Sequence, residues 1–557
     1  MKTRSGGADR IVVVAKAIAL AVLLGLAPLA WASEIRLGFE TLLPLTNYGR
    51  IPAVYAFVLI AAFAGLLTTP FLRSTAIRVP LVIVFMLAFG LDRIVFSVTG
   101  SHLDTTVMRM LWQAREMAGP AMAAYRNAIL LNVGAAAVLG VPLAWPLASG
   151  LRPRFALAPI AAIALVAAHY WSWGSMVEGY PAPLAVPVRA AWILEGPRTQ
   201  NDLPLAPVPR PPAVPAAFRK IVFVIDESIR GDYLTINNPE TDTTPFLEQS
   251  AGRLINFGVA TSAANCSYQS RWMLRRGIRP WQLPAHESPS APDPVRFDEG
   301  PRTTVWQFAR SARFTTVHVD AWSSYYGPYH DGQTLVERDF IDRTITFDDV
   351  VPYQRDREAA RSLASILNGT EPAFVVVDKI GAHFPYDSWS APDFNRFHRA
   401  DGARFEYARN TREDRIGSYE NALAWSVDGF FHELLGHADL RGALVVYTSD
   451  HGQDFDRPQA HCSVSNTQAS EAWVPLFALA DDKDFGHALA ASAKASYGKA
   501  THFDIFPTLL IAMGYDARWV TDTYGPSLLD IPSNRPRRFM IGDVWVPGWR
   551  KWVDAGP

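Results

Sequence analysis

The chain has 557 residues, of which 49% are hydrophobic, and its 52 Lys and Arg nearly balance 53 Asp and Glu. This balance argues against a nucleic-acid partner, because nucleic-acid binding needs clustered basic charge. Two cysteines, Cys266 and Cys462, are too few for a disulfide framework or a thiolate zinc site, although they allow one bridge. The length exceeds that of one ordinary domain, and the hydrophobic residues are concentrated in the first third.

Five apolar runs in this first third are each long enough to cross a bilayer as a helix. They cover residues 11–31, 53–72, 79–98, 127–148 and 154–174. The basic N-terminus and the short connections around 73–78 and 152–154 fall on one side, which the positive-inside rule assigns to the cytoplasm. We therefore expect residues 1–175 to form a five-helix transmembrane bundle that leaves the rest of the chain outside. The first run also fits a cleaved signal peptide, which gives the same topology.

Residues 176–217 are rich in Pro and Ala, as in PLAPVPRPPAVPAAF. Proline has no amide donor and does not sustain a helix or a central strand. The composition predicts a semi-extended linker. It would lead into a soluble domain that covers residues 218–557.

Short apolar runs separated by helical patterns fill this second part of the chain. The runs read KIVFVID, LINFGVA, FTTVHVD, AFVVVDK and ALVVYTSD. The helical patterns lie around 244–252, 267–277, 303–312, 355–368, 416–435 and 502–514. This alternation predicts an α/β domain with a mostly parallel sheet sandwiched by helices. Ligands of such sheets bind beyond the carboxyl ends of the strands.

Acidic residues and histidines gather at three predicted strand ends. They are Asp226 and Glu227 after the first strand, Asp378 and His383 after the fourth, and Asp450 and His451 after the fifth. One such residue alone is more simply explained as a turn residue or a helix cap. Several together supply the oxygen and imidazole ligands that a divalent cation prefers. Such a cation would lower the pKa of a coordinated serine hydroxyl.

The segment CSYQSR, residues 266–271, joins a predicted strand to a predicted helix. Ser267 is explained either as an N-cap or as a nucleophile, because the start of a helix favours a phosphoryl or sulfuryl group. Arg271 lies four residues later on the same helical face. It would either clamp an anionic substrate oxygen or form a structural ion pair.

Several motifs follow one another along the chain and read IVFVIDESIRGDYL, DTTPFL, INFGVATSAANCSYQS, IGAHFPY, SYENALAWSVD, YTSDHGQ and AHCSVS. Together they resemble the membrane phosphoethanolamine transferases of the alkaline phosphatase and sulfatase superfamily. The likeness covers most of residues 218–515, and TSDHG is its most specific part. The five predicted spans match the plan of that family as well.

The resemblance implies that a catalytic Zn²⁺ is bound by four residues, which are Glu227, Ser267, Asp450 and His451. Mn²⁺, or a second metal, is an alternative. His383 and His461 would contact the substrate phosphate or a second metal and act in catalysis, and Arg271 is the further substrate-binding candidate. The implied reaction uses Ser267 as nucleophile on phosphatidylethanolamine, and a phosphoserine-type intermediate passes phosphoethanolamine to an envelope acceptor. Lipid A, core sugar and periplasmic glucan are the acceptor candidates.

The implied location is the bacterial inner membrane, with a monomeric chain and its catalytic domain in the periplasm. Some residues depart from the family pattern, since Ser267 replaces the usual Thr and Gln453 stands where Glu is common. A family lysine is also missing between 320 and 329. Phosphoglycerol transfer is therefore the alternative function, followed by sulfatase or phosphoesterase activity, and a noncatalytic receptor or scaffold is the alternative from another class.

The sulfatase alternative depends on conversion of a Cys or Ser to formylglycine. Counted from Ser267, Arg271 occupies the place of the sulfatase arginine, but Gln269 replaces the usual Pro or Ala. Counted from Cys266, a Ser stands at 270 where Arg is required. An unmodified Ser267 fits phosphoryl transfer better. If the regions around Ser267 and His461 converge, the neighbouring Cys266 and Cys462 are close enough for a disulfide.

Overall fold

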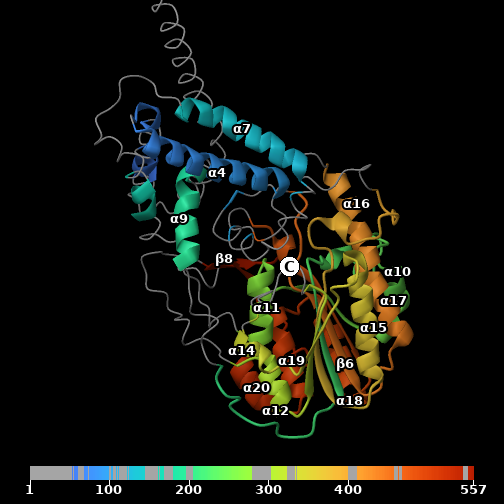
Figure 1. Cartoon of the computed structure of the whole chain (residues 1–557). Helices are drawn as coiled ribbons and strands as arrows, with labels where there is room; N and C mark the ends of the chain where they lie inside the picture. The colour runs from blue at the N-terminus through green and yellow to red at the C-terminus, as the bar shows by residue number, and fades with distance from the viewer. Residues whose placement is uncertain are drawn as a thin grey trace, which may run out of the picture.

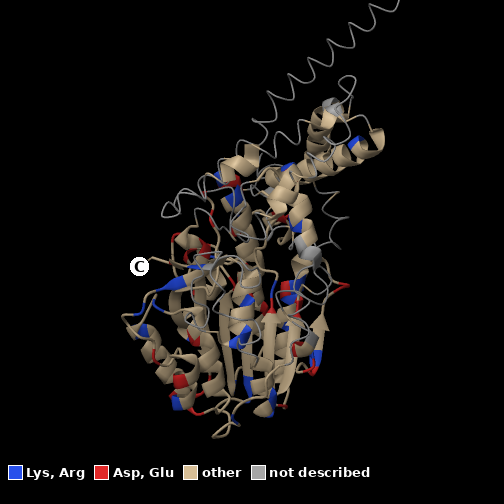
Figure 2. Ribbon diagram, turned by 90° about the vertical axis from the view of Figure 1, so that its left-hand side faces the viewer, with Lys and Arg blue, Asp and Glu red and all other residues tan. Residues whose placement is uncertain are grey.

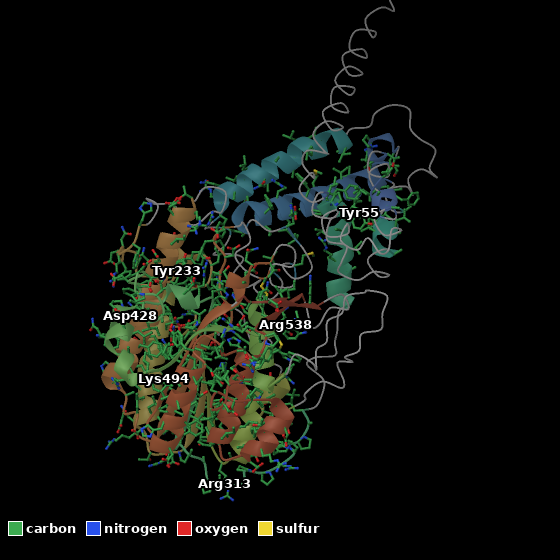
Figure 3. The ribbon with its side chains drawn as sticks, turned by 180° about the vertical axis from the view of Figure 1, so that it is seen from behind. Tyr55, Tyr233, Arg313, Asp428, Lys494 and Arg538 are labelled. Atoms are coloured by element: carbon green, nitrogen blue, oxygen red, sulfur yellow. A yellow bond between two sulfur atoms is a disulfide. The ribbon has the colours of Figure 1, made fainter. Side chains whose placement is uncertain are left out.

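The computed structural model shows an α/β domain with a smaller set of N-terminal helices at one end (Figure 1). Apart from single positions, it describes residues 55–60, 68–72, 74–99, 125–144, 163–168, 180–195, 205–278, 303–322, 335–398, 411–456, 467–542 and 550–556. Tyr55 lies among the N-terminal helices, and Arg313 lies at the opposite end of the α/β domain (Figure 3).

A seven-stranded sheet forms the centre of the domain, in the order β2-β7-β6-β1-β5-β3-β4. The strands are β1 Lys220–Asp226, β2 Ile255–Thr261, β3 Thr315–Asp320, β4 Arg343–Thr346, β5 Ala373–Asp378, β6 Ala443–Ser449 and β7 Trp473–Ala480. Neighbouring strands from β6 to β4 pair in parallel, whereas β7 is antiparallel to both β6 and β2. The predicted mostly parallel sheet is confirmed.

Strand β7 was not among the predicted strands, because its sequence WVPLFALA contains Pro475, which normally argues against a central strand. The register between β2 and β7 shifts between Asn256 and Val259, and Val259 is the partner of Pro475. Gly258 lies within this irregularity with a positive φ of 78°. The bulge therefore accommodates a residue that has no amide to donate.

Helices cover both faces of the sheet. One face carries α10 Pro245–Gln249, α15 Arg355–Asn368, α16 Arg412–Ala422 and α17 Gly429–His437, and the other carries α11 Ser267–Arg276, α12 Val305–Ser311, α18 Lys483–Ala495, α19 Ile505–Ala512 and α20 Ala517–Tyr524. Alternate residues of β1 enter the two cores, with Val222 and Val224 on the first face and Ile221 and Phe223 on the second. Burial on both faces explains the uninterrupted apolar runs of the sequence. The domain also includes α14 Leu335–Arg338 and a hairpin of β8 Arg538–Gly542 with β9 Arg550–Asp554.

The N-terminal part contains α4 Thr75–Thr99, α7 Arg126–Ala144 and α9 Ala182–Glu195. Charged residues are sparse on these helices and frequent on the α/β domain (Figure 2). Helix α4 packs against α7 through buried side chains such as Phe85, Phe89 and Leu139. Among the described residues, one helix is long and apolar enough to cross a membrane, at Thr75–Ser97. This helix coincides with the predicted run 79–98. The predicted run 11–31 lies outside the described residues. The total of five spans therefore stays a prediction.

The predicted linker 176–217 differs from the structure in its first half. Residues Ala182–Glu195 form helix α9, with Pro187 inside it. Leu184, Ala185 and Val188 of α9 are buried against apolar side chains that include Tyr55. This packing stabilises the helix by more than the one hydrogen bond that Pro187 cannot donate costs it. The extended conformation predicted for this segment is therefore wrong. Residues 205–217 contain no helix or strand.

Candidate active site

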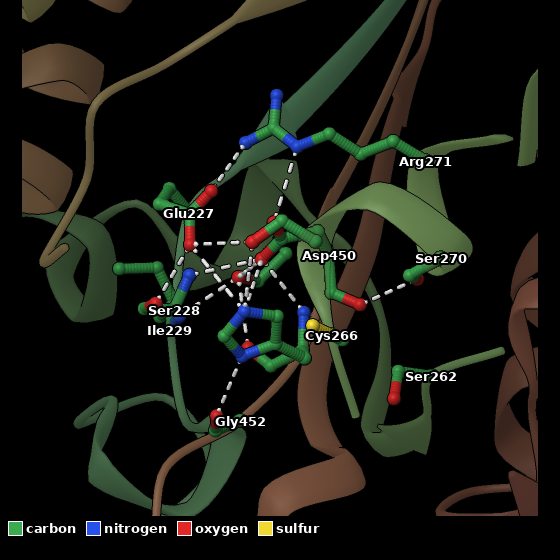
Figure 4. Close-up of polar contacts among 12 residues, drawn as sticks. Glu227, Ser228, Ile229, Ser262, Cys266, Ser270, Arg271, Asp450 and Gly452 are labelled. Atoms are coloured by element: carbon green, nitrogen blue, oxygen red, sulfur yellow. Dashed lines mark hydrogen bonds and ion pairs between the residues drawn. The ribbon is translucent and has the colours of Figure 1, made fainter. Parts of the chain in front are cut away.

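Three predicted site residues converge where β1 and β6 end side by side (Figure 4). Glu227 follows β1, and Asp450 and His451 follow β6. One potential ligand atom from each lies within 4.8 Å of the others, and all three residues are buried. The two strand ends are joined directly, because the amide of Asp450 donates to the carbonyl of Asp226 at 2.9 Å.

Backbone amides orient the Asp450 carboxylate. Its Oδ1 accepts from the amide of Ser228 at 3.0 Å and from the amide of His451 at 2.7 Å. Ser228 has a φ of 63°, a value that turns the chain sharply after β1 and directs this amide toward Asp450. The position of Asp450 is therefore set by the backbone as well as by side chains.

His451 presents its Nε2 to the site. Its Nδ1 lies 2.8 Å from the carbonyl of Gly452, and because a carbonyl only accepts, Nδ1 carries the proton. Nε2 lies 3.4 Å from Glu227 Oε1 and 3.8 Å from Asp450 Oδ1. A metal-binding histidine usually donates a hydrogen bond from the ring nitrogen that does not bind the metal, as Nδ1 does here.

Ser267 is the first residue of α11, and Cys266 holds the N-cap position with an extended backbone. The explanation of Ser267 as an N-cap is therefore wrong. Its Oγ lies 3.2 Å from Glu227 Oε1 and 3.1 Å from His451 Nε2. The start of the helix thus brings the Ser267 hydroxyl into contact with two of the three other predicted ligands.

Arg271 is fully buried and joins three carboxylates that come from three strand ends. Its Nε donates to Asp450 at 3.1 Å, Nη1 to Asp378 at 2.8 Å and Nη2 to Glu227 at 3.0 Å. Of the two roles considered for Arg271, the structure shows the ion pair. The predicted contact between Arg271 and substrate stays untested, with all three nitrogens already bonded to protein.

The charges of this cluster shift the titration of its members. Burial and the neighbouring Asp450 carboxylate raise the pKa of Glu227 to about 7. Burial also acts to raise the pKa of Asp450, but the charges of His451 and Arg271 hold that pKa far below its usual range. Burial opposes a charged His451, and the two carboxylates nevertheless raise its pKa to about 9. When no metal ion is bound, the negative charge of the site is therefore balanced by a guanidinium and an imidazolium, and binding of a metal ion at His451 would release the proton from Nε2.

Asp378 and His318 extend the cluster along the strand ends. Asp378 ends β5, and its Oδ2 lies 2.7 Å from Nε2 of the buried His318 on β3. Burial acts to raise the pKa of Asp378, but Arg271 and His318 hold it well below its usual range. Sequence reasoning did not select His318, although a histidine within the apolar run FTTVHVD was the available signal.

The two other predicted catalytic histidines are placed differently. His383 is half-buried, and the amide of the preceding Ala382 donates to the carbonyl of Glu227 at 3.0 Å, so its loop lies against the site. The His383 ring contacts the indole of Trp322, with centroids 5.0 Å apart. His461 lies outside the described residues, and its predicted role is not tested.

Cys266 and Cys462 form a disulfide with Cα atoms 4.6 Å apart. The amide of Cys462 also donates to the carbonyl of Asn265 at 2.8 Å. The bridge predicted as possible is therefore present. It also removes Cys266 as a free thiol, so this residue is not available for conversion to formylglycine.

The residues at the centre of the site suit a divalent metal ion. Two carboxylates, an imidazole Nε2 and a serine hydroxyl from Glu227, Asp450, His451 and Ser267 form a mixed oxygen and nitrogen donor set, which Zn²⁺ accepts. Together with the strand order, this arrangement defines an α/β domain of alkaline phosphatase and sulfatase type.

The family model described as Sulfatase matches residues 219–515, more than half of the chain. The chain therefore belongs to the sulfatase family. No curated protein matches it.

Several solved structures are similar to this chain. The integral membrane lipooligosaccharide phosphoethanolamine transferase A (EptA) of Neisseria meningitidis is 15% identical, with 89% of this chain and 95% of that chain covered and a TM-score of 0.56. The periplasmic domain of Escherichia coli EptC in complex with Zn is 15% identical, with 63% of this chain and 96% of that chain covered and a TM-score of 0.47. The EptC periplasmic domain of Campylobacter jejuni is 14% identical, with 57% and 95% covered and a TM-score of 0.45.

Proposed function

We propose that the chain is a metal-dependent phosphoethanolamine transferase of the bacterial inner membrane. It moves phosphoethanolamine from phosphatidylethanolamine, through a phosphoserine-type intermediate on Ser267, to an envelope acceptor such as lipid A, core sugar or periplasmic glucan. The observation that carries this proposal is the contact of Ser267 Oγ with Glu227 Oε1 at 3.2 Å and His451 Nε2 at 3.1 Å. A hydroxyl at the start of a buried helix, beside such ligands, is suited to nucleophilic attack on phosphorus.

Glu227, Asp450, His451 and Ser267 would hold the metal ion, which lowers the pKa of the serine hydroxyl when it is bound. In the first half-reaction a bond forms between Ser267 Oγ and phosphorus. The bond from phosphorus to the diacylglycerol oxygen breaks, and this oxygen leaves with the proton that the Ser267 hydroxyl gives up. The amides at the start of α11 favour the phosphoryl group, because their partial positive charge faces it.

The second half-reaction reverses the roles of the two oxygens. An oxygen of the acceptor forms a bond to phosphorus, the bond to Ser267 Oγ breaks, and the serine hydroxyl regains a proton. The Nδ1 of His383 donates to the carbonyl of Phe384, so that in the neutral form of the ring the lone pair is on Nε2. We assign this Nε2 to accept the proton of the acceptor hydroxyl, and we assign His461 to the substrate phosphate.

The membrane part supports a lipid donor. Helix α4 is long and apolar enough to span a bilayer, and the EptA structure that covers 89% of this chain is named an integral membrane protein. We propose five spans with the catalytic domain in the periplasm, and a monomeric chain. An anchored domain keeps the nucleophile near the lipid headgroups.

The test is a trapped reaction of the full chain, in vesicles of phosphatidylethanolamine or of phosphatidylglycerol, with mass spectrometry of the Ser267 peptide. We expect phosphoethanolamine on Ser267 with the first lipid, none with Ser267→Ala, and retention with Ser267→Thr, which keeps the hydroxyl. Phosphoglycerol on Ser267 with the second lipid alone would assign the chain to phosphoglycerol transfer. An unmodified peptide with both lipids would refute the covalent route. Mass spectrometry of envelope lipids and glycans, wild type against Ser267→Ala, identifies the acceptor.

A further inference from the structure

Asp226 is adjacent to Glu227 but faces away from the proposed metal ligands. Its Oδ1 accepts from the amide of Glu227 at 2.9 Å. Its Oδ2 accepts from the hydroxyl of Tyr447 at 2.7 Å and from the ammonium of Lys379. Both carboxylate oxygens are therefore committed to protein donors behind the site.

Lys379 is fully buried and follows the last residue of β5. In addition to Asp226, its Nζ lies 3.3 Å from Ser426 Oγ, 3.6 Å from Asp356 Oδ2 and 4.9 Å from the centre of the Phe430 ring. A buried lysine needs partners of this kind, because an unpaired charge in a protein interior is very unfavourable. The Asp226–Lys379 pair thus joins the ends of β1 and β5.

The same network fixes the loop that leads to His383. Asp356 of α15 accepts from the amide of Ile380 at 2.9 Å and from that of Gly381 at 3.0 Å. Gly381 has a φ of 60°, and a Cβ there would collide with Asp226 and with the carbonyl of Glu227. The loop therefore passes so close to β1 that only glycine fits.

A π-helical segment, Leu423–Asp428, supplies one more member of the network. Ser426 lies within it and donates to Asp356 as well as contacting Lys379. Single π-helical turns inside α-helices are frequent at functional sites. Here the turn directs a serine hydroxyl at the buried network.

We propose that the Asp226–Lys379 ion pair is a positioning element of the active site, which holds Glu227 and the 380–383 loop in the arrangement that binds the metal ion. Asp226 is accordingly not a metal ligand itself. This inference rests on the proposed function only in taking Glu227 as a metal ligand. Two hydrogen bonds connect Glu227 to this network. The amide of Glu227 donates to Asp226, and the carbonyl of Glu227 accepts from the amide of Ala382 in the loop at 3.0 Å.

The test is the Zn²⁺ affinity of the full chain in detergent, measured by competition with a chromophoric chelator, for wild type and Lys379→Met. The matched control is Arg276→Met, which removes the cation of another buried pair, with Glu337. Arg276 ends α11, nine residues after Ser267 and about 14 Å along the helix. Lys379→Met removes the cation that faces two buried carboxylates, Asp226 and Asp356, and Arg276→Met removes a cation that faces the buried Glu337.

We expect Lys379→Met to weaken Zn²⁺ binding by about 10- to 100-fold, the usual effect of losing a group that supports a ligand. Arg276→Met should keep a Zn²⁺ affinity within about twofold of wild type, even if its melting temperature falls as much as that of Lys379→Met. Equal affinities in Lys379→Met and wild type would overturn the inference. If Lys379→Met does not fold, Asp226→Asn/Lys379→Met removes both charges, and wild-type affinity in that variant would equally overturn it.

The affinity measurement also separates this inference from the proposed function. A wild-type chain that binds Zn²⁺ and transfers no headgroup would refute the proposed function. The loss of affinity in Lys379→Met would still support the positioning element. A wild-type chain that binds no Zn²⁺ would overturn both.

Discussion

Cys266 and Cys462, which are 196 positions apart in the chain, are joined by a disulfide, so the residue before Ser267 is covalently held. Cys266 is also the N-cap of α11, and its carbonyl accepts from the amide of Ser270 at 3.0 Å. The bridge therefore anchors the first turn of the helix that carries the proposed nucleophile.

Removal of this disulfide is expected to lower both stability and activity. A thiol titration of the unreduced, denatured chain should find no free thiol, and Cys266→Ala/Cys462→Ala should lose about 2–4 kcal/mol of stability. Headgroup transfer should fall with it, because the start of α11 loses its anchor. Two reactive thiols in the native protein would contradict the bridge. As a control, a reductant should lower the stability of wild type and leave that of the double variant unchanged.

Arg271→Met should destabilise the metal-free protein by about 3–5 kcal/mol, because it leaves three buried carboxylates without their shared cation. The comparison is Arg361→Met, whose half-exposed guanidinium pairs with Glu433 at 2.9 Å. That pair should contribute at most about 1 kcal/mol. Thermal unfolding with and without chelator measures both variants. Equal losses in the two would refute the assigned role of Arg271.

The stability of the fold should decrease with acidity through His502. Burial lowers the pKa of this histidine to about 3. Its Nδ1 accepts from the amide of Ala263 at 3.0 Å, so the ring is neutral when folded. The unfolded chain binds a proton there below about pH 6.5, while the folded chain does not. Stability therefore falls as the pH drops from about 6.5 toward 3.

This effect is measured by denaturant unfolding of His502→Gln and wild type from pH 7 to pH 4. The free energy of unfolding should depend less steeply on pH in the variant than in wild type, by up to about 1.4 kcal/mol per pH unit. The exposed His487→Gln controls for the removal of an imidazole from the surface. Identical slopes in His502→Gln and wild type would exclude His502 as the source.

Metal removal should lower the melting temperature of wild type. A ligand at 100 times its Kd stabilises a folded protein by about 2.7 kcal/mol. Glu227→Gln should lose most of this stabilisation by Zn²⁺, because it removes a ligand charge, whereas Glu433→Gln, on α17, should keep it. If Zn²⁺ raises the melting temperature of Glu227→Gln as much as that of wild type, the metal binds elsewhere.

Much of the site was predictable from local sequence. Continuous apolar runs identify β1, β5 and β6, and the carboxyl ends of parallel strands share one edge of a sheet. Glu227, Asp450 and His451 were therefore expected to meet, and they do. The start of α11 at Ser267 also follows from its pattern.

The direction of long side chains was not predictable in this way. Arg271 was equally suited to a substrate or to an ion pair, and its three carboxylate partners lie at the ends of three separate strands. Lys379 appeared only as a residue after a strand, and its burial depends on Asp226 and Asp356 from distant segments. Helix α9 needed the packing of neighbouring helices to overcome its prolines.

The sequence by itself determined the α/β class, the apolar character of the first third and the residues at the strand ends, because periodicity and strand polarity are local properties. The tertiary structure alone decided which charges are paired, that Cys266 is bridged to Cys462, and that β7 runs against its neighbours. These features depend on which distant segments are brought into contact, and a buried charge or thiol is defined by the partner it meets there.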